Sequence, residues 1–311
     1  MLKVGIVGIN FKSKKHIEAL LLLKESFSLV GYYDPNLNNT NKSNLDLKCF
    51  DSYESLLAEV DVIDIVSPLY KHFEFISIAL RKSKHIFIEK PVTESEDEAR
   101  SLISLSSEAD VKVQISSEEK FNPAFEAANK FINKPMLIDF NRSIDVSTFV
   151  KGQCLVLDYM LSDIDLVLSV IKSGVKKISA NALSILNNSV DLVDVRLEFD
   201  NGAIAKLHVD KIGENKSVKS KFYQLNNLID INFTENNLQV FSNEVDGFNG
   251  ETTSFQDVNS IKNEFVSFYD SIINDKETKV SLLNGLDSLM IAKKILDLIN
   301  RTNIAYIDNN N

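Results

Sequence analysis

The sequence lacks several features that mark particular classes of protein. No apolar run approaches the ~18 residues of a membrane-spanning helix, and the glycine-containing N-terminal segment does not have the layout of a cleavable signal peptide. Cysteine is rare: Cys49 and Cys154 lie far apart and fit no metal-binding spacing. We therefore expect no membrane segment, no bound metal and a reducing compartment, which makes the cytoplasm the expected location.

Positive charge is also scarce. Lys and Arg number 34 against 44 Asp and Glu, so the net charge is 34 − 44 = −10. An acidic chain argues against nucleic acid as the main partner, although a few local donors suffice for a phosphorylated small molecule. The hydrophobic share of 44% is ordinary for a soluble globular protein, and 311 residues are enough for two domains.

Residues 1–120 are predicted to form a doubly wound, parallel-sheet domain of the dinucleotide-binding (Rossmann) type. Short β-rich apolar segments alternate there with amphipathic helical segments, which is typical of α/β folds. Strands are expected at 2–8, 28–33, 61–66, 84–88 and 111–115, and helices at 14–27, 52–59, 70–82 and 94–109. A polar, asparagine-rich loop is expected at 36–44.

Residues 121–311 are predicted to form an α+β domain with a large, mostly antiparallel open sheet for substrate binding and oligomerisation. Strands are expected at 136–142, 176–186, 190–199, 203–210, 218–224, 227–232 and 237–241, helices at 122–132, 155–172, 259–275 and 283–299, and a polar loop at 243–256. The Asn201-Gly202 pair is a strong hairpin signal. A sheet face without helices needs a partner, so we predict a homodimer or homotetramer through it.

The stretch His85-Ile86-Phe87-Ile88-Glu89-Lys90-Pro91 is predicted to be a buried strand that ends in two charges and a proline. Polar groups at the carboxyl ends of parallel strands line the crevice where open α/β sheets bind ligands. Lys90 is therefore a candidate acid/base or substrate-positioning group. The alternative is a solvated loop after a strand.

The first strand-to-helix turn, residues 5–13, is a weakened form of the G-x-G-x-x-G fingerprint of dinucleotide sites. Gly8 fills its slot, but Asn10 and Ser13 replace the later glycines. Backbone N–H groups at the helix start, from Ile9 to Phe11, can still hold a phosphate.

Polar residues also end the second and third strands. Asp34 stands where a carboxylate bonds ribose hydroxyls; it would repel a 2′-phosphate and so favours NAD over NADP, although it also suits a turn before a proline. Ser67 and Pro68 end the third strand, and His72 opens the next helix, either beside the cofactor or as a surface histidine.

The second domain supplies further candidates. Asp158 and Ser162 are four residues apart and share a helix face, which implies a lined cavity or a cap. Arg142 can bind a carboxylate or phosphate, or form a surface ion pair. Asp163 and Asp165 are expected to be ordinary polar positions or interdomain acceptors.

Together these residues resemble the Gfo/Idh/MocA family of NAD(P)-dependent oxidoreductases over nearly the whole chain. The matching segments are Val4–Gly8, Tyr33-Asp34-Pro35, Asp61–Pro68 with His72, Lys84–Pro91 and Leu157–Asp165. The resemblance implies hydride transfer between a nicotinamide cofactor and a sugar or cyclitol carbon.

The resemblance also implies roles for single residues. Those that it places along the cofactor are Gly8, Ile9, Asn10, Phe11, Asp34, Ser67, Pro68, His72, Glu89 and Lys90. Lys90 is the position that hydrogen-bonds the reacting hydroxyl, and the following Pro91 is often cis. Asp158 matches a substrate-site aspartate. Four residues later the family usually has a histidine that shuttles the proton, but this chain has Ser162.

A narrower likeness is to UDP-N-acetylglucosamine 3-dehydrogenases and related nucleotide-sugar enzymes. It rests on Glu119-Lys120-Phe121-Asn122-Pro123 and Arg142, and implies that Glu119 and Arg142 contact the substrate, although Ser116-Ser117 stands where those enzymes have Gly-His. We therefore predict an NAD-dependent oxidoreductase acting on a sugar or nucleotide sugar. The alternative, to which Asn10, Ser13, Ser117 and Ser162 point, is a catalytically weakened member that binds NAD or a sugar nucleotide as a sensor or partner subunit.

Overall fold

The computed structural model describes the whole chain except residues 37–45, 150–151, 187–188, 214, 245–246 and 310–311, so nearly all of the loop predicted at 36–44 lies outside the described residues. The chain divides into two compact units. The first comprises Met1–Glu118 and Asn259–Leu286, and the second Glu119–Val258 and Asp287–Asn311. The sequence prediction gave all of 121–311 to a second domain and missed this return of residues 259–286 to the first unit.

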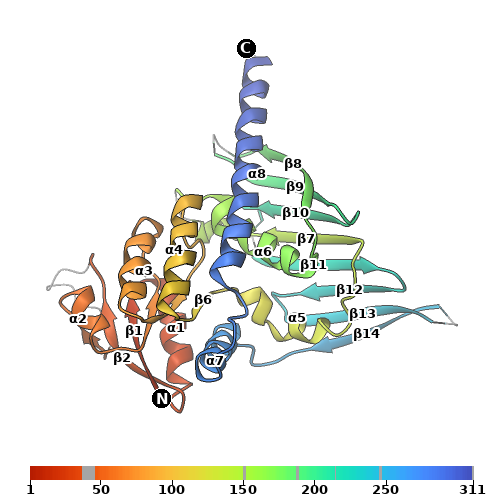
Figure 1. The fold of residues 1–311 in the computed structure, drawn as a ribbon. Coiled ribbons are helices and arrows are strands. Elements are labelled where there is room, and N and C mark those ends of the chain that lie inside the picture. The colour runs from red at the N-terminus through yellow and green to blue at the C-terminus, as the bar shows by residue number, and fades with distance from the viewer. Residues whose placement is uncertain (37–45, 150–151, 187–188, 214, 245–246, 310–311) are drawn as a thin grey trace. The chain divides into compact units, whose positions relative to one another are not determined.

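The first unit contains a six-stranded parallel sheet in the order β3-β2-β1-β4-β5-β6, which confirms the predicted doubly wound architecture. Figure 1 labels its strands β1, β2 and β6. The strands are β1 (Leu2–Val7), β2 (Phe27–Tyr33), β3 (Lys48–Cys49), β4 (Val62–Ile65), β5 (His85–Ile88) and β6 (Val113–Ile115). Successive strands run to one side from β1 to β3 and to the other from β4 to β6. The direction therefore reverses between β1 and β4, and open sheets of this kind bind ligands at the carboxyl ends of such strands.

Among the described residues, the α-helices that lie wholly in the first unit are α1 (Phe11–Leu21), α2 (Tyr53–Leu57), α3 (His72–Arg81), α4 (Glu96–Ala109) and α7 (Ser260–Ile273). Helix α7 belongs here because its apolar face completes the core on one side of the sheet. Phe265 and Phe268 of α7 are fully buried in one cluster with Ile17 of α1 and Phe87 of β5. The rings of Phe87 and Phe265 stack with 4.3 Å between their centroids. The late helix α7 is thus part of the core beneath the carboxyl end of β5.

The second unit contains an eight-stranded, mostly antiparallel sheet in the order β14-β13-β12-β11-β7-β10-β9-β8, as predicted, with β7 and β10 parallel. The strands are β7 (Leu137–Ser143), β8 (Val175–Leu183), β9 (Leu192–Phe199), β10 (Ile204–Asp210), β11 (Ser217–Gln224), β12 (Asn227–Asn232), β13 (Asn237–Glu244) and β14 (Gly247–Ser254). The predicted Asn201-Gly202 turn joins β9 to β10. The loop predicted at 243–256 is wrong, because β14 pairs with β13 there. This edge strand exposes residues 250–254, so it lacks an apolar alternation.

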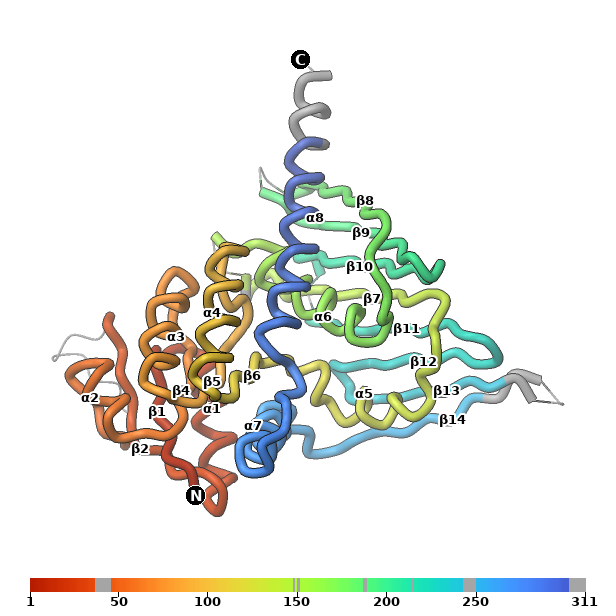
Figure 2. The backbone as a smooth tube through the Cα atoms, in the orientation of Figure 1, coloured from red at the N-terminus to blue at the C-terminus, as the bar shows by residue number. Residues whose placement is uncertain are grey.

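Helices cover one face of this second sheet. They are α5 (Pro123–Ala128), a π-helix (Leu155–Met160) that continues into α6 (Leu161–Val170), and α8 (Leu282–Asn309), whose course Figure 2 traces. Phe125, Ile164 and Ile295 pack from these helices into the core of the sheet. Asp194 and Arg196 of β9 alternate with the buried residues and are not buried. The predicted homo-oligomer through that polar face stays a prediction.

Candidate functional site

The turn between β1 and α1 requires a glycine at position 8 for two reasons. Gly8 has a φ of +92°, which L side chains rarely adopt. A Cβ atom there would also lie 2.8 Å from the backbone N and Cα of Ser67. The turn therefore passes directly against the carboxyl end of β4, at the point where the strand order reverses.

Asn10 and Ser13, which replace two glycines of the fingerprint, cap helix α1. The Asn10 Oδ1 atom accepts hydrogen bonds from the backbone N–H groups of Lys12 and Ser13 at 2.8 and 3.1 Å. The Ser13 hydroxyl in turn accepts from the Asn10 N–H at 2.8 Å. This reciprocal capping stabilises the helix start. It also engages two of the N–H groups that a pyrophosphate would otherwise use.

Asp34 lies beside this turn. Its Oδ2 atom accepts from the Ile9 N–H and its Oδ1 atom from the Asn36 N–H, both at 2.8 Å. The carboxylate predicted to bind ribose and the turn predicted to bind phosphate are thus in direct contact. Each carboxylate oxygen retains capacity for another hydrogen bond.

His72 is a buried histidine and not a surface one, which corrects that alternative. Its ring nitrogens lie 2.7 Å from the Ser67 carbonyl oxygen and 2.9 Å from the Pro91 carbonyl oxygen. Burial lowers the pKa of His72, although both carbonyls favour the protonated ring. The ring ties the end of β4 to the segment after β5, where the Lys90–Pro91 peptide is cis, as the family resemblance implies.

Glu89 takes part in a buried network that sequence reasoning missed. Its Oε1 atom lies 3.0 Å from His16 Nε2, and its Oε2 atom accepts from Lys12 Nζ at 2.7 Å. His16 Nδ1 lies 2.9 and 3.1 Å from the two carboxylate oxygens of Asp64. His16 and Asp64 are fully buried. One imidazole thus bridges α1, β4 and the end of β5.

Charge within this network follows from the contacts. Burial alone would lower the pKa of His16, but Asp64 and then Glu89 more than offset it, and the pKa lies well above its usual value. Burial likewise opposes ionisation of Glu89, but Lys12 and His16 outweigh it and hold the pKa of this carboxyl below its usual range. Both groups are therefore charged near neutral pH.

Lys90 points to a second set of polar groups in the same unit. Its Nζ atom donates to the Ser117 hydroxyl at 3.2 Å, and the Ser117 N–H donates to Glu264 Oε2 at 3.0 Å. Glu264 comes from α7 and is fully buried. Burial, and after it the charge of Glu118, raises the pKa of Glu264 well above its usual value. Lys90 is therefore part of a built polar site, and the solvated-loop alternative fails.

The sequence held one usable signal for the missed residues. Asp64 interrupts the otherwise apolar Val62–Ile65, and a charge in a fully buried strand needs a partner. Lys12 and His16 are four residues apart and share a helix face, but this spacing does not say that the face meets Asp64 and Glu89, and Glu264 is distant in the chain. Their contacts arise from the fold alone.

In the second unit, Asp158 is an exposed residue of the π-helix. Its Oδ2 atom accepts a hydrogen bond from the Cys154 N–H at 2.6 Å, so this aspartate caps the start of the helix, which was one of the two interpretations of its position. The predicted single helix 155–172 is a π-turn followed by α6, and the four residues from Asp158 to Ser162 cross that junction. Short π-segments occur often at functional sites.

Arg142 forms a buried ion pair and not the surface pair that was the alternative reading. Its Nη2 atom donates to Glu119 Oε1 at 2.7 Å, and its guanidinium also binds Asp163. Burial opposes this charge, but the two carboxylates raise the pKa of Arg142 above its usual value. Lys120 Nζ donates to the buried Asp165 at 2.7 Å. Asp163 and Asp165 therefore bind cations of their own unit.

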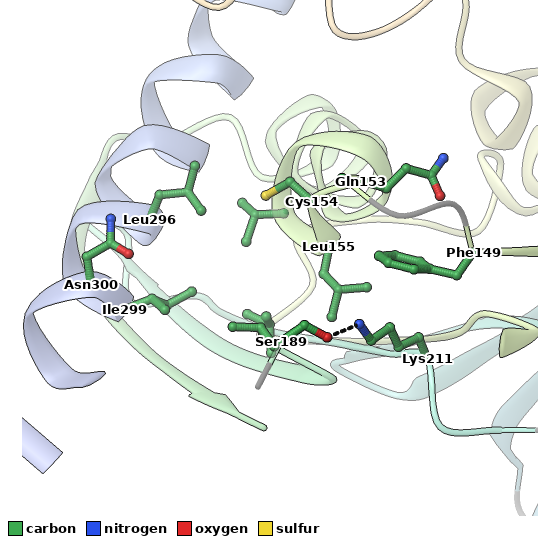
Figure 3. Close-up of a pocket in the computed structure, with 13 residues that line it drawn as sticks. Phe149, Gln153, Cys154, Leu155, Ser189, Lys211, Leu296, Ile299 and Asn300 are labelled. Carbon is green, nitrogen blue, oxygen red and sulfur yellow. Dashed lines mark hydrogen bonds between the residues drawn. The ribbon is translucent and has the colours of Figure 1, made fainter. Parts of the chain in front are cut away.

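The second unit also contains a pocket of about 680 Å³ bounded by the π-helix, β9 and α8 (Figure 3). Its walls are mostly apolar, with Leu155 and Ile299 pointing inward. The buried Lys211 donates to the Ser189 hydroxyl at 2.7 Å, and its Nζ lies 3.3 Å from Asp191. The lining residues include none of the predicted site residues.

Two classes of feature are absent from the described part of the chain. No helix there is both long and apolar enough to cross a membrane. Among those same residues, no three His, Cys, Asp or Glu side chains gather as a metal site would require.

Comparison with known proteins identifies the N-terminal region. Residues 2–117 match the model of the family described as "Oxidoreductase family, NAD-binding Rossmann fold". The chain is similar to UDP-N-acetylglucosamine 3-dehydrogenase from Acidithiobacillus ferrooxidans, with 23% identity over 250 residues that cover 77% of each protein. It also matches the solved structure of that enzyme with a TM-score of 0.89 and 20% identity, over 96% of this chain and 97% of the other.

Two further likenesses bear on the choice of function. A levoglucosan dehydrogenase solved in complex with NADH and L-sorbose matches with a TM-score of 0.86 and 16% identity, over 96% of this chain and 97% of that one. At such identities the structural likeness shows a shared fold. The galactose/lactose metabolism regulatory protein GAL80 of Saccharomyces cerevisiae is 26% identical over 163 residues, covering 47% of this chain and 37% of that protein.

Proposed function

We propose that this chain is a member of the Gfo/Idh/MocA oxidoreductases and an NAD-dependent dehydrogenase acting on a hydroxyl-bearing carbon of a sugar or nucleotide sugar. The observation that carries the proposal is the position of Glu89-Lys90-Pro91 at the carboxyl end of β5, in a sheet whose strand order reverses between the adjacent β4 and β1. That edge is where α/β sheets of this type bind dinucleotides.

The residues of the first unit fit a dinucleotide. Gly8 permits the tight turn, and Asp34 stands beside the turn with oxygens that can accept ribose hydroxyls. The Ser67 hydroxyl is buried at the adjacent strand end and has no hydrogen-bond partner among the described residues, so a bound ligand would satisfy it. We propose NAD over NADP because the Asp34 carboxylate would repel a 2′-phosphate. When bound, the cofactor supplies the acceptor for the hydride.

Lys90 is proposed to exchange the proton of the reacting hydroxyl. In oxidation an uncharged Lys90 amine takes the proton of the hydroxyl while hydride leaves the carbon that bears this hydroxyl. In reduction the Lys90 ammonium returns the proton to the oxygen. The Ser117 hydroxyl orients the Lys90 Nζ. Asp158 is proposed to orient the substrate hydroxyls. Ser162 lacks the pKa of a general base, so it can contribute only a hydrogen bond.

We propose a nucleotide sugar as the substrate class because the similarity to UDP-N-acetylglucosamine 3-dehydrogenase extends over 77% of the chain. Glu119 and Arg142 would contribute to its recognition as a paired unit. Because Asp163 also binds Arg142, the group contains one positive and two negative charges, so it offers directional hydrogen bonds and no net positive charge.

A substrate screen tests the proposal. The protein is incubated with NAD and a panel of UDP-sugars, sugar phosphates and free sugars, and NADH formation is followed by its absorbance. NADH binding is measured separately by the fluorescence of the cofactor itself. NADH formation with at least one UDP-sugar is the expected result. Binding without turnover on any sugar would reject the dehydrogenase and favour the second candidate.

That second candidate is a catalytically weakened member that binds NAD or a sugar nucleotide as a sensor or partner subunit. Asn10 favours it, because the Asn10 side chain engages N–H groups of Lys12 and Ser13 at the predicted phosphate site. Ser162 in place of a histidine and the similarity to the regulatory protein GAL80 favour it as well. Turnover, and not cofactor binding, separates the two candidates.

We also propose a homodimer or homotetramer that associates through the polar face of the second sheet. The strand residues on that face, such as Asp194 and Arg196, carry both signs of charge and suit a polar contact between copies. Light scattering coupled to size exclusion would give the mass. A monomer of 35.0 kDa at micromolar concentration would reject the association.

A further inference from the structure

His16 is placed so that it acts on Lys90 through Glu89. The imidazole lies in α1 with no exposed surface, and the rings of Phe87 and Phe265 meet its edges at centroid distances of 5.5 and 5.7 Å. In these apolar surroundings the polar partners of the ring are carboxylates at its two nitrogens. Those partners are Asp64 at Nδ1 and Glu89 at Nε2.

The contacts of the ring favour its doubly protonated form. An ionised carboxylate only accepts hydrogen bonds, so each ring nitrogen that faces one must carry a proton. Burial raises the pKa of Asp64, whereas the charge of His16 and its hydrogen bond oppose that rise. With Asp64 ionised at 2.9 Å and Glu89 ionised at 3.0 Å, the two contacts are both satisfied only by the imidazolium form. A neutral imidazole would leave one carboxylate facing a lone pair in a dry environment, which is costly.

The charges around the ring are matched. Asp64 comes from β4, Glu89 from the end of β5 and Lys12 from α1, so two carboxylates face two cations. From α7, Glu264 also faces this region, and its burial favours the neutral acid. The Glu89 carboxylate is thus bound at both oxygens, and the residue is further anchored by its N–H, which donates to the Ile65 carbonyl.

We propose that His16, kept as an imidazolium by Asp64, is a positioning residue that holds Glu89 ionised and fixed, and through it holds Lys90 where it exchanges the substrate proton. The inference rests on the proposed function for its catalytic meaning. Lys90 follows Glu89 directly, so a Glu89 side chain released from His16 frees the peptide that aims the Lys90 Nζ at Ser117. Small misplacements of a reacting group reduce turnover strongly.

The test uses variants that separate positioning from folding. His16→Gln alone leaves Asp64 buried without a cationic partner and is expected to destabilise the unit. The double variant His16→Gln/Asp64→Asn removes that unpaired charge but still deprives Glu89 of the imidazolium. His85→Gln is the matched control, because His85 lies on β5 of the same unit and its Nδ1 accepts only from the Lys112 N–H among the contacts of the described residues.

The first measurement is the nitrogen NMR spectrum of the histidine side chains in ¹⁵N-labelled protein. The His16 signals, identified by their loss in His16→Gln, are expected to show two protonated nitrogens at pH 8. A neutral His16 ring at pH 8 would overturn the proposal, whatever the protein catalyses.

The second measurement is the rate at which Lys90 is reductively methylated, followed by mass spectrometry. In the double variant this rate should rise about fivefold, the ratio that loss of one net hydrogen bond gives. The methylation rate of the partly exposed Lys71, and the Lys90 rate in the His85→Gln protein, should stay unchanged. An unchanged Lys90 rate would refute positioning. This readout needs no turnover, so it decides the role of His16 even if the screen finds no substrate.

If a substrate is found, kcat of the double variant should fall at least about tenfold with NADH affinity retained. A double variant with wild-type kcat would show that His16 serves folding only and would overturn the proposal. If the wild-type protein forms no NADH with any sugar, the proposed function is rejected. The methylation rates still decide whether His16 positions Lys90, so the two failures can be told apart.

Discussion

Replacing Gly8 by alanine tests the most constrained point of the predicted cofactor site. The variant suffers two penalties. A residue with a Cβ at positive φ costs roughly 1–2 kcal/mol, and the added Cβ, 2.8 Å from the Ser67 backbone, forces the turn and β4 apart. Forced overpacking of this kind costs about 1–3 kcal/mol. We therefore expect Gly8→Ala to lower the free energy of unfolding by about 2–5 kcal/mol in total.

Gly202→Ala is the matched control because Gly202 also has a positive φ, +84°, but no atom lies within 4 Å of its added Cβ. It should carry only the first penalty of roughly 1–2 kcal/mol. The two glycines lie in different units, so amide hydrogen exchange in β1 and β4, and in β9 and β10, is the suitable assay. NADH affinity should fall in Gly8→Ala and stay unchanged in Gly202→Ala. Equal costs for the two variants would refute the close approach of the turn to β4.

Three other perturbations give further tests. Asn10→Gly should tighten NADH binding, because it frees the amides that Asn10 now caps while costing only a few tenths of a kcal/mol in capping; weaker binding would mean that Asn10 itself holds the cofactor. Asp34→Asn should reduce the preference for NAD over NADP, measured by titration of both cofactors, because the charge that repels the 2′-phosphate is gone. An unchanged ratio of the two affinities would mean that residues other than Asp34 discriminate between the cofactors. Because the pKa of His16 is raised on folding, protonated His16 stabilises the folded protein fully below its unfolded-state pKa of about 6.5, and this stability is lost as the pH rises through the folded-state pKa. Because the pKa of Glu89 is lowered on folding, ionised Glu89 stabilises the folded protein above about pH 4.3, and this stability is lost on acidification. The difference in melting temperature between wild type and His16→Gln/Asp64→Asn should therefore be largest between about pH 5 and pH 6.5 and shrink at alkaline pH; a constant difference would contradict the charged network.

The sequence predicted the architecture well where one physical signal dominates. The alternation of apolar strands with amphipathic helices specified the parallel sheet, and the alternation of Val193 and Val195 with charged residues specified an antiparallel strand. The signal failed at β14, an edge strand that buries too little to need apolar residues. It also failed at α7, whose amphipathic pattern indicates a helix but does not say which of two cores will accept Phe265.

The candidate site was predictable only in part, for a related reason. Gly8, Asp34 and Lys90 could be identified because they follow the ends of predicted strands, and the carboxyl ends of parallel strands meet at one edge of the sheet. The partners that hold Glu89 and Ser117 beside Lys90 come from other elements: His16 from α1, Glu264 from α7. Such contacts follow from the packing of elements distant in sequence, and no local pattern encodes them.

The comparison of wild-type protein with Lys90→Ala, at equal NAD occupancy and with the sugar that the screen identifies, tests the central claim most directly. Lys71→Ala, which removes a partly exposed lysine paired with Glu74, is the control. Loss of the proton-exchanging group is predicted to lower kcat by roughly 10²–10⁴-fold while NADH affinity and Lys71→Ala turnover stay near wild type. Turnover by Lys90→Ala at the wild-type rate would contradict the assignment of Lys90 and the mechanism built on it.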